Sequence, residues 1–263
     1  AMSHKLCRVL TLCLALAAPS FTAAQAPFAS APETLASFPL PSLTDRPFAL
    51  QFAGAVALFS LPDGPTRKAI PAVLILPDAL GADGRAVPYV ESLLGAGIAV
   101  LELRDASAEA ARAALALLAS DPRIEAPRLG VLGFGQGARL ALGLPGADVR
   151  ALLYPGCASL PVPQTAPGAV LLLHGAEDPA NPATACASLA ARLRARGAEA
   201  AVREIPGAGY AWDYPALGQA PAALLPAVGR AERLAVHPWP AMAAQSATEV
   251  AGFFAQHFSR GAP

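Results

Sequence analysis

The sequence predicts an α/β protein with a doubly wound, mostly parallel sheet and helices on both faces. Short apolar runs, typical of strands covered on both faces, alternate along the chain with segments of helical periodicity. These runs are 72–76, 98–103, 128–132, 151–153, 169–173 and 200–205. Strands that alternate with helices at this spacing form parallel βαβ units, whose ligand sites lie beyond the carboxyl ends of the strands.

The first part of the predicted domain contains two strands and two helices. The short apolar segments 48–52 and 56–61 are separated by Ala-Gly and favour an antiparallel lead-in to the sheet. A helix is expected over 85–94, and a second one begins at the cap residue Ser107 and ends before Asp121.

The second part of the chain is expected to add two more helices and a long loop. Asn181 and Pro182 favour an N-cap and a first helical position for the helix that carries Cys186. Proline-rich residues 214–240 have weak periodicity and are expected to form a loop that could cover a pocket. A last helix has four apolar residues on one face, namely Ala247, Val250, Phe254 and Phe258.

Composition and charge narrow the possible partners. The 263 residues include 19 basic and 19 acidic side chains, and only 14% of them are charged. The chain therefore has no electrostatic footprint for nucleic acid or for an anionic membrane surface. Its length suits one large α/β domain, which we expect over 47–263, after an extended arm rich in Pro, Ala and Ser over 27–46.

The N-terminus has the layout of a secretory signal peptide. Lys5 and Arg8 precede the short apolar run 9–18, and a stretch of small residues follows. We expect the signal over 1–26, with Ala1 as an addition ahead of the natural start. The apolar run is short for a bilayer span, so a permanent membrane anchor is the weaker alternative. The mature protein is then expected to be exported, either periplasmic or secreted.

Two cysteines remain after removal of the signal, Cys157 and Cys186. An exported protein with two cysteines favours one disulfide. The first follows the end of a predicted strand, and the second lies in the first turns of the helix after a neighbouring strand. Two buried thiols are the alternative.

The most informative stretch is RLGVLGFGQGARLAL, residues 128–142. A buried strand runs into Gly133-Phe134-Gly135-Gln136-Gly137, and a helical pattern follows directly. Strand, sharp glycine-flanked turn and helix are the context of a nucleophile elbow, G-x-S-x-G. Here the central residue is Gly135, so the position that would carry the reactive atom has no side chain.

The motifs AVLILPDALG, RLGVLGFGQGARLAL, LLYPGC, LLLHGAEDPANP and IPGAGYAWD follow one another in this order. Together they resemble the dienelactone hydrolase family of α/β-hydrolases, over roughly residues 56–258. The resemblance implies the α/β-hydrolase fold and an esterase or lactonase that uses a Cys or Ser nucleophile, an Asp and a His. It also implies two backbone amides that stabilise an oxyanion.

Carried over by position, the resemblance leaves one member of the triad in place. Gly135 stands at the nucleophile position, and Tyr210, in AGYAW, stands at the histidine position. Asp178, in HGAED, matches the acid. The amides of Ala79 and Gln136 match the two oxyanion donors.

These substitutions remove the ordinary chemistry. Nucleophilic acyl transfer needs a nucleophile with a base within hydrogen-bond reach, and neither Gly135 nor Tyr210 supplies one. The prediction is therefore a pseudoenzyme or a binder of a small carbonyl or carboxylate compound. Gly135→Ser combined with Tyr210→His is expected to restore measurable esterase activity.

Two other functions stay open. One is an active ester or lactone hydrolase with an unconventional nucleophile, for which Cys157 is a candidate and His237 a candidate substitute base. The other is a non-catalytic interaction protein that uses its proline-rich segments. The sequence contains no metal-ligand spacing and no G-x-G-x-x-G pattern, so no metal or other cofactor is expected.

Each candidate residue also has a purely structural interpretation. Glycine at position 135 relieves the backbone strain of an elbow. Asp178 could brace the loop before Pro182 and accept a hydrogen bond from the Tyr210 hydroxyl. His174 closes a strand and is expected to be structural, and His257 is expected on the surface of the last helix.

Overall fold

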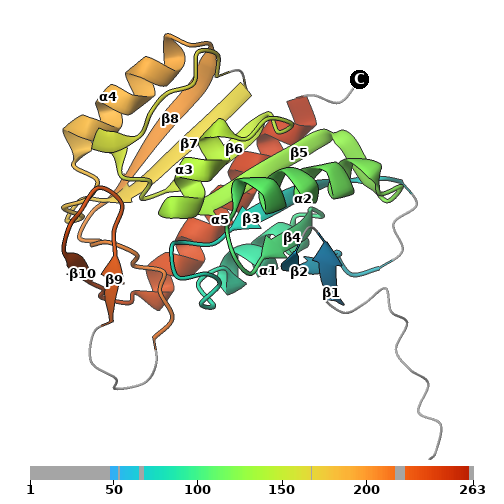
Figure 1. Cartoon of the computed structure of the whole chain (residues 1–263), viewed down its shortest axis with the longest axis horizontal. Helices are drawn as coiled ribbons and strands as arrows, with labels where there is room; N and C mark the ends of the chain where they lie inside the picture. Colours follow the sequence, from blue (N-terminus) through green and yellow to red (C-terminus); the bar gives the residue numbers. More distant parts are fainter. Residues whose placement is uncertain (1–47, 53, 65–67, 167, 217–222, 261–263) are drawn as a thin grey trace, which may run out of the picture. The chain divides into compact units, whose positions relative to one another are not determined.

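A computed structural model describes residues 48–52, 54–64, 68–166, 168–216 and 223–260 (Figure 1). The signal peptide predicted over 1–26 and the arm predicted over 27–46 lie outside these ranges. Within them, no helix is both long enough and apolar enough to cross a bilayer.

An eight-stranded sheet forms the centre of the fold, with the order β1-β2-β4-β3-β5-β6-β7-β8. Its strands are β1 Phe48–Phe52, β2 Ala55–Ser60, β3 Ile70–Leu76, β4 Ala99–Leu103, β5 Ile124–Phe134, β6 Val149–Leu153, β7 Gly168–Gly175 and β8 Ala198–Ile205. The predicted lead-in is confirmed, because β2 pairs antiparallel with both β1 and β4. The other five pairings are parallel.

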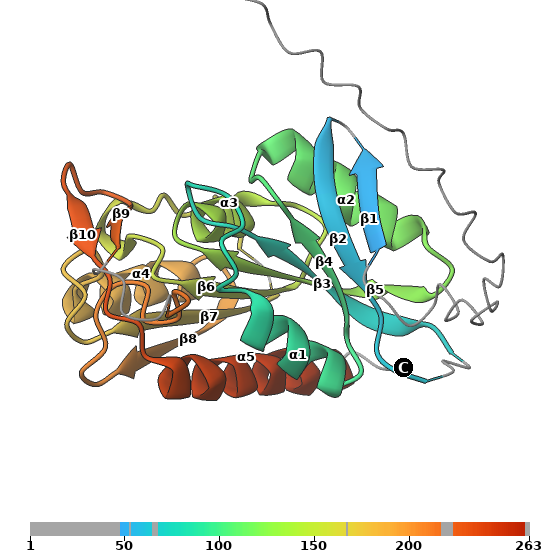
Figure 2. The ribbon, with the colours of Figure 1, turned by 90° about the horizontal axis from the view of Figure 1, so that it is seen from below.

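Helices cover both faces of this sheet, as predicted. They are α1 Val87–Gly95, α2 Ala108–Ser120, α3 Gln136–Gly143, α4 Ala183–Arg194 and α5 Pro240–Arg260. Figure 2 shows α1 and α5 side by side on one face, while α2 and α3 lie on the other. Buried residues of α4 belong to the same apolar cluster as those of α2 and α3. The predicted doubly wound fold is confirmed.

Strand β3 shows why both faces are covered. Residues 72–76 are almost completely buried, and alternate side chains point to opposite faces. Leu74 and Leu76 pack in the cluster with α2 and α3, whereas Val73 and Ile75 pack in the cluster with α1 and α5. Full burial of one such side chain contributes about 1.5–3 kcal/mol.

Local signals set most helix ends, with one exception. The Ser107 side chain accepts a hydrogen bond from the Ala110 amide at 3.1 Å, which confirms it as the N-cap of α2. The expected N-cap Asn181 is wrong. Helix α4 begins at Ala183 and Pro182 occupies the cap position. The Asn181 side chain instead makes hydrogen bonds within the functional site.

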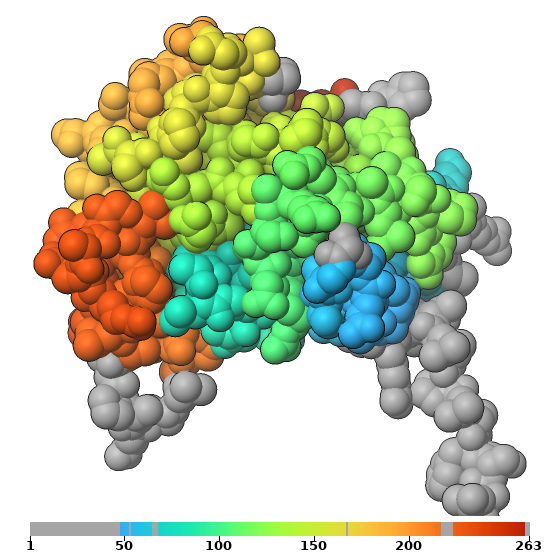
Figure 3. Space-filling view, viewed as in Figure 1, coloured from blue at the N-terminus to red at the C-terminus, as the bar shows by residue number. Residues whose placement is uncertain are grey.

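The loop expected over 214–240 contains a small antiparallel hairpin, β9 Leu224–Pro226 and β10 Arg233–Ala235. Three-residue strands give too short a pattern to read from sequence. The hairpin turn packs against the segment after β6, because a Cβ on Gly156 would lie 2.8 Å from Val228. Figure 3 shows the orange hairpin on the same face as the teal segment that follows β3.

The predicted disulfide is present between Cys157 and Cys186, with an S–S distance of 2.05 Å. It joins the short 3₁₀ turn Cys157–Ser159 to α4 and so fixes the chain just beyond the end of β6. A bridge that closes a loop of this size stabilises a fold by about 2–4 kcal/mol.

Candidate functional site

The turn between β5 and α3 has the backbone of an elbow. Gly135 adopts φ 48° and ψ −108°, a region that a residue with a Cβ occupies at a cost of about 1–3 kcal/mol. Its amide donates to the Leu153 carbonyl at 3.0 Å, which holds the turn against β6. The sequence prediction of a sharp, glycine-dependent turn after β5 therefore agrees with the geometry.

The carboxylate of Asp78, which follows β3, lies directly against this turn. Its Oδ1 atom accepts hydrogen bonds from the amides of Ala79 at 2.8 Å and Gln136 at 2.9 Å. The structure thus brings the two predicted oxyanion donors together, but the oxygen between them belongs to the protein itself. A Cβ on Gly135 would lie only 2.6 Å from the Asp78 Cγ, so the carboxylate fills the space of the missing side chain.

The second oxygen of Asp78 is also fully engaged. Oδ2 accepts a hydrogen bond from the Tyr210 hydroxyl at 2.8 Å and pairs with Arg85 Nη1 at 3.2 Å. Burial, and then the nearby Asp78 charge, raises the pKa of Tyr210 well above its ordinary value. Tyr210 is therefore a hydrogen-bond donor at neutral pH, and it cannot act as a base there.

This arrangement continues into the core through a network of tyrosines. Arg85 Nη1 donates to the Tyr154 hydroxyl at 3.0 Å, and Tyr154 donates in turn to Asp213 Oδ1 at 2.8 Å. Tyr89 donates to the other oxygen of Asp213, also at 2.8 Å. Burial raises the pKa of Asp213, although Arg85 and both tyrosines oppose that shift. One buried guanidinium thus lies between two buried carboxylates, Asp78 and Asp213.

Aromatic packing fixes this network. The Tyr154 ring meets Tyr210 edge to face, with centroids 5.1 Å apart, and meets Trp212 in the same way at 5.4 Å. Tyr154 has φ 40°, the left-handed region that is unusual for a bulky residue. Such strain persists only where the surroundings determine the conformation.

Asp178, the retained acid position, braces a different loop. Its oxygens accept hydrogen bonds from the Ala180 amide and the Asn181 side chain, both at 2.8 Å. Asn181 Oδ1 accepts in turn from the amides of Gly156 at 2.7 Å and Cys157 at 3.2 Å. The hydrogen bond expected from Tyr210 to Asp178 is not formed, because the Tyr210 hydroxyl points to Asp78 and to the Pro226 carbonyl.

The remaining candidates lie apart from the elbow. His174 is buried, with Nδ1 3.1 Å from the Gly175 carbonyl oxygen, and His257 packs on Phe253 of the same helix. His237 is exposed. The sulfur of Cys157 is in the disulfide and offers no thiol. Among the described residues no cluster of His, Cys, Asp or Glu has the arrangement of a metal site.

Sequence reasoning missed the residues that fill the elbow: Asp78, Arg85, Tyr89, Tyr154 and Asp213. The available signal was an acidic residue directly after a buried strand, in the loop that supplies an oxyanion amide. The sequence alone did not show that this side chain turns back onto the elbow.

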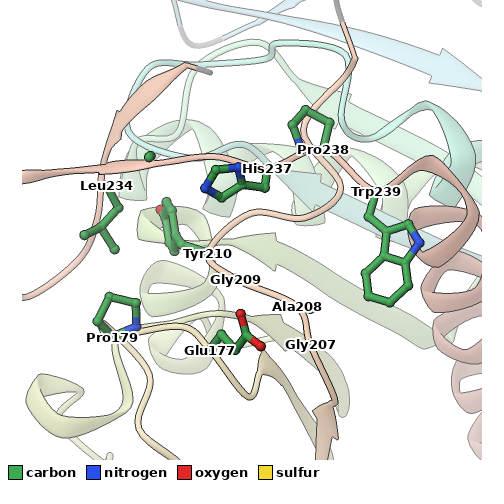
Figure 4. Close-up of a pocket in the computed structure, with 11 residues that line it drawn as sticks. Glu177, Pro179, Gly207, Ala208, Gly209, Tyr210, Leu234, His237, Pro238 and Trp239 are labelled. Carbon is green, nitrogen blue, oxygen red and sulfur yellow. The ribbon is translucent and has the colours of Figure 1, made fainter. Parts of the chain in front are cut away.

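A pocket lies beside Tyr210, at the carboxyl ends of β7 and β8, and its volume is about 670 Å³. We call it the β7–β8 pocket. Figure 4 shows Glu177 on one wall, Tyr210 and His237 on the opposite wall, and Trp239 at the far end. Its lining residues are Glu177, Pro179, Gly207, Ala208, Gly209, Tyr210, Leu234, Ala235, His237, Pro238 and Trp239.

Solved structures with the same architecture define the class of protein. An esterase of the hyperthermophilic archaeon Pyrobaculum calidifontis superposes with a TM-score of 0.61 at 13% identity, over 80% of this chain and 85% of that one. Est1E of Butyrivibrio proteoclasticus gives 0.58 at 13% identity, over 81% and 99% of the two chains. The protein thus has the α/β-hydrolase fold.

A family model and a third structure agree with the resemblance seen in the sequence. The model of the dienelactone hydrolase family matches residues 98–224. A dienelactone hydrolase-like promiscuous phosphotriesterase, P91 from metagenomic libraries, superposes with a TM-score of 0.57 at 19% identity, over 77% of this chain and 92% of that one. Among curated proteins, none matches significantly. The chain is a dienelactone-hydrolase-like α/β-hydrolase, and the resemblance seen in the sequence is confirmed.

Proposed function

We propose that this protein is an exported pseudoenzyme of the dienelactone hydrolase type, in which an internal carboxylate has replaced the catalytic group. One observation carries the proposal: Asp78 Oδ1 accepts hydrogen bonds from both the Ala79 and Gln136 amides. An acyl-transfer intermediate needs those two donors for its oxyanion. In this protein the donors already hold a negative charge.

All parts of the ordinary mechanism are affected. Gly135 has no reactive atom, and Tyr210 is held as a donor to Asp78. A hydrolase that loses only its triad keeps roughly 10³–10⁴-fold catalysis over water from the oxyanion hole and from binding. Here both amides already donate to the Asp78 carboxylate, which removes that residual activity too. A carbonyl or carboxylate ligand at the elbow would have to displace Asp78, so any ligand is expected in the β7–β8 pocket.

The rival proposal of an unconventional hydrolase finds little support. Cys157 lacks a free thiol, and it is Tyr210, not the exposed His237, that donates a hydrogen bond to Asp78 at the elbow. Export is supported by the signal-like N-terminus and by the Cys157–Cys186 bridge, which persists in oxidising compartments.

The first test is hydrolysis of p-nitrophenyl acetate and simple lactones by the purified protein. We expect rates no higher than those of a generic protein surface. Saturable turnover that co-purifies with the protein would overturn the proposal. Loss of that turnover in His237→Ala would then identify the substitute group.

A gain-of-function series tests why activity is absent. Contrary to the expectation from sequence alone, the double variant Gly135→Ser/Tyr210→His should stay near background, because Asp78 still fills the site of the serine. Adding Asp78→Ala should raise esterase activity to at least about tenfold above background, by freeing the two amides for an oxyanion. Thermal melts verify that each variant is folded.

The matched control is the triple variant with alanine in place of the new serine, Gly135→Ala/Tyr210→His/Asp78→Ala. It has the same cavity and the same histidine but no nucleophile, so it should stay at background. If the double variant is already as active as the serine triple variant, Asp78 does not block the elbow.

A further inference from the structure

We infer that the β7–β8 pocket binds a small organic cation, an ammonium group attached to an apolar body. This inference goes beyond the loss of catalysis and does not depend on it. The pocket's volume, about 670 Å³, falls in the range of small-molecule sites. It lies beyond the carboxyl ends of β7 and β8, where ligands of open α/β sheets bind.

The charge of the pocket is the first argument. Glu177 is the one lining residue with a carboxylate, and neither lysine nor arginine lines the pocket. Within the described ranges, the Glu177 carboxylate has no ion pair and no side-chain hydrogen bond. Its chain neighbour Asp178 is buried and acts electrostatically on Tyr210. A cation therefore meets an uncompensated negative charge here, whereas a carboxylate ligand would be repelled.

The backbone holds Glu177 in place. Its amide donates to the Ala208 carbonyl at 2.9 Å, which ties the loop after β7 to the loop after β8. Both loops contribute to the pocket wall. Figure 4 shows the Glu177 carboxylate facing the loop after β8, across the pocket from Tyr210 and His237. The carboxylate is thus positioned at a fixed wall, even though it is open to solvent.

Aromatic rings supply the second argument. Trp239 is one of the few large apolar side chains left exposed, at 40%. Its amide donates to the Trp212 carbonyl at 2.8 Å, and its indole lies over the Gly207 turn, 3.9 Å from where a Cβ of that glycine would be. Tyr210 also lines the pocket, but it is only 2% exposed, so Trp239 supplies the accessible ring. The faces of tryptophan and tyrosine attract cations electrostatically.

Apolar side chains complete the site. Leu234, Pro179 and Pro238 also line the pocket, and they offer contact to the hydrocarbon part of a ligand. A carboxylate, aromatic faces and apolar walls in one pocket suit an alkylammonium better than a metal ion, because a hard cation requires several oxygen ligands.

The experiment compares choline with 3,3-dimethylbutan-1-ol, its neutral isostere, by isothermal titration calorimetry on the wild-type protein. We expect choline to bind with a dissociation constant of about 1 mM or below, at least about tenfold more tightly than the isostere. Phenylacetate, as an anionic probe, should not bind measurably. Equal affinity for choline and its isostere, absence of choline binding, or tighter binding of phenylacetate would each overturn the inference.

Two variants assign the site. Glu177→Gln keeps the shape of an exposed side chain and should weaken choline binding at least about fivefold, and Trp239→Leu should weaken it as well. Glu232→Gln removes another exposed carboxylate, 69% accessible, from outside the pocket lining and should leave the affinity unchanged. If Glu177→Gln binds choline like the wild type, the site lies elsewhere. Choline carries no ester, so these results are independent of the hydrolysis assays.

Discussion

The elbow and the β7–β8 pocket both lie at the carboxyl ends of the parallel strands, and Tyr210 belongs to both. At the elbow, Asp78 uses its two oxygens in four contacts, all within the protein. On the other side of the Tyr210 ring, the Glu177 carboxylate is unpaired within the described residues, beside a space of about 670 Å³. The Asp78 carboxylate is therefore paired within the protein, whereas the Glu177 carboxylate is available to a ligand.

Under the proposed function, this difference explains how a catalytic site can be lost without leaving a void at Gly135. The absence of a side chain at Gly135 makes room for Asp78, and the tyrosine at position 210 donates a hydrogen bond that an open active site would not need. The substitutions at these positions fit together as one replacement. Asp78 occupies the elbow, while the β7–β8 pocket beside Tyr210 remains open.

The largest effect is expected for Asp78→Ala, which tests whether the Asp78 contacts stabilise the elbow. The substitution leaves Arg85 buried without its full complement of charge and removes the acceptor for two amides and a phenol. Arg85 keeps its ion pair with Asp83, but two amides and a phenol lose their acceptor, and unsatisfied buried donors cost about 1–3 kcal/mol each, so the total is about 3–5 kcal/mol. We expect the free energy of unfolding in urea to fall by that amount.

The control for Asp78→Ala is Glu232→Ala, which breaks an ion pair with Arg230 whose partners are 69% and 36% exposed. Exposed pairs are worth about 0–1 kcal/mol. If both variants lose the same small amount, the Asp78 network does not stabilise the elbow.

The next largest effect is expected for Gly135→Ala. The new methyl group would overlap the Asp78 carboxylate and would sit at φ 48°, so we expect a loss of about 2–4 kcal/mol. Gly252→Ala is the matched control, because a Cβ there meets nothing within 4 Å. That helical substitution should be neutral or stabilise slightly.

A double-mutant cycle isolates the contact between these two residues. Once Asp78→Ala has removed the carboxylate, Gly135→Ala should cost at least about 1 kcal/mol less than it does alone. Additive losses in the cycle would mean that Gly135 serves the backbone conformation alone, and that Asp78 does not occupy its side-chain space.

Much of this fold could be predicted from the sequence, because hydrophobic periodicity and the residues that form turns and caps are local signals. The apolar runs predicted the parallel strands, Ser107 predicted a helix start, and the two cysteines left in an exported chain predicted the disulfide. The glycine-rich turn after β5 also followed from its own residues.

That the Asp78 side chain occupies the elbow could not be predicted in this way. Asp78 meets Gln136 across 58 positions of sequence, and its role depends on the direction of one side chain after a turn. The same limit applies to Asn181, which matched a helix cap locally but bonds to the Gly156 and Cys157 amides in the fold. Tertiary hydrogen bonds outweighed local preference at both positions.

The smallest expected effect is a pH dependence of stability that arises from Asp213, the buried carboxylate of the tyrosine network. Burial raises the pKa of Asp213 above the value of about 3.9 for an unfolded chain. The folded protein then binds this proton more tightly than the unfolded chain does. The cost of the buried charge is fully present above the folded pKa and is removed as the pH falls toward the unfolded value.

The wild type should therefore gain stability relative to Asp213→Asn as the pH is lowered from about 7 to about 4, by no more than about 1–2 kcal/mol. Urea unfolding of both proteins across this range measures the difference. Asp121 provides the opposite sign, because its side-chain hydrogen bonds with Arg123 lower the pKa of that carboxyl. Its contribution is present above the unfolded pKa and is lost as the pH falls through the folded one, so the wild type should lose stability relative to Asp121→Asn on acidification. The stability differences for Asp213→Asn and Asp121→Asn should therefore change with opposite signs on acidification. If they change with the same sign, Arg85 and the two tyrosines outweigh burial, and the fold stabilises the ionised form of Asp213.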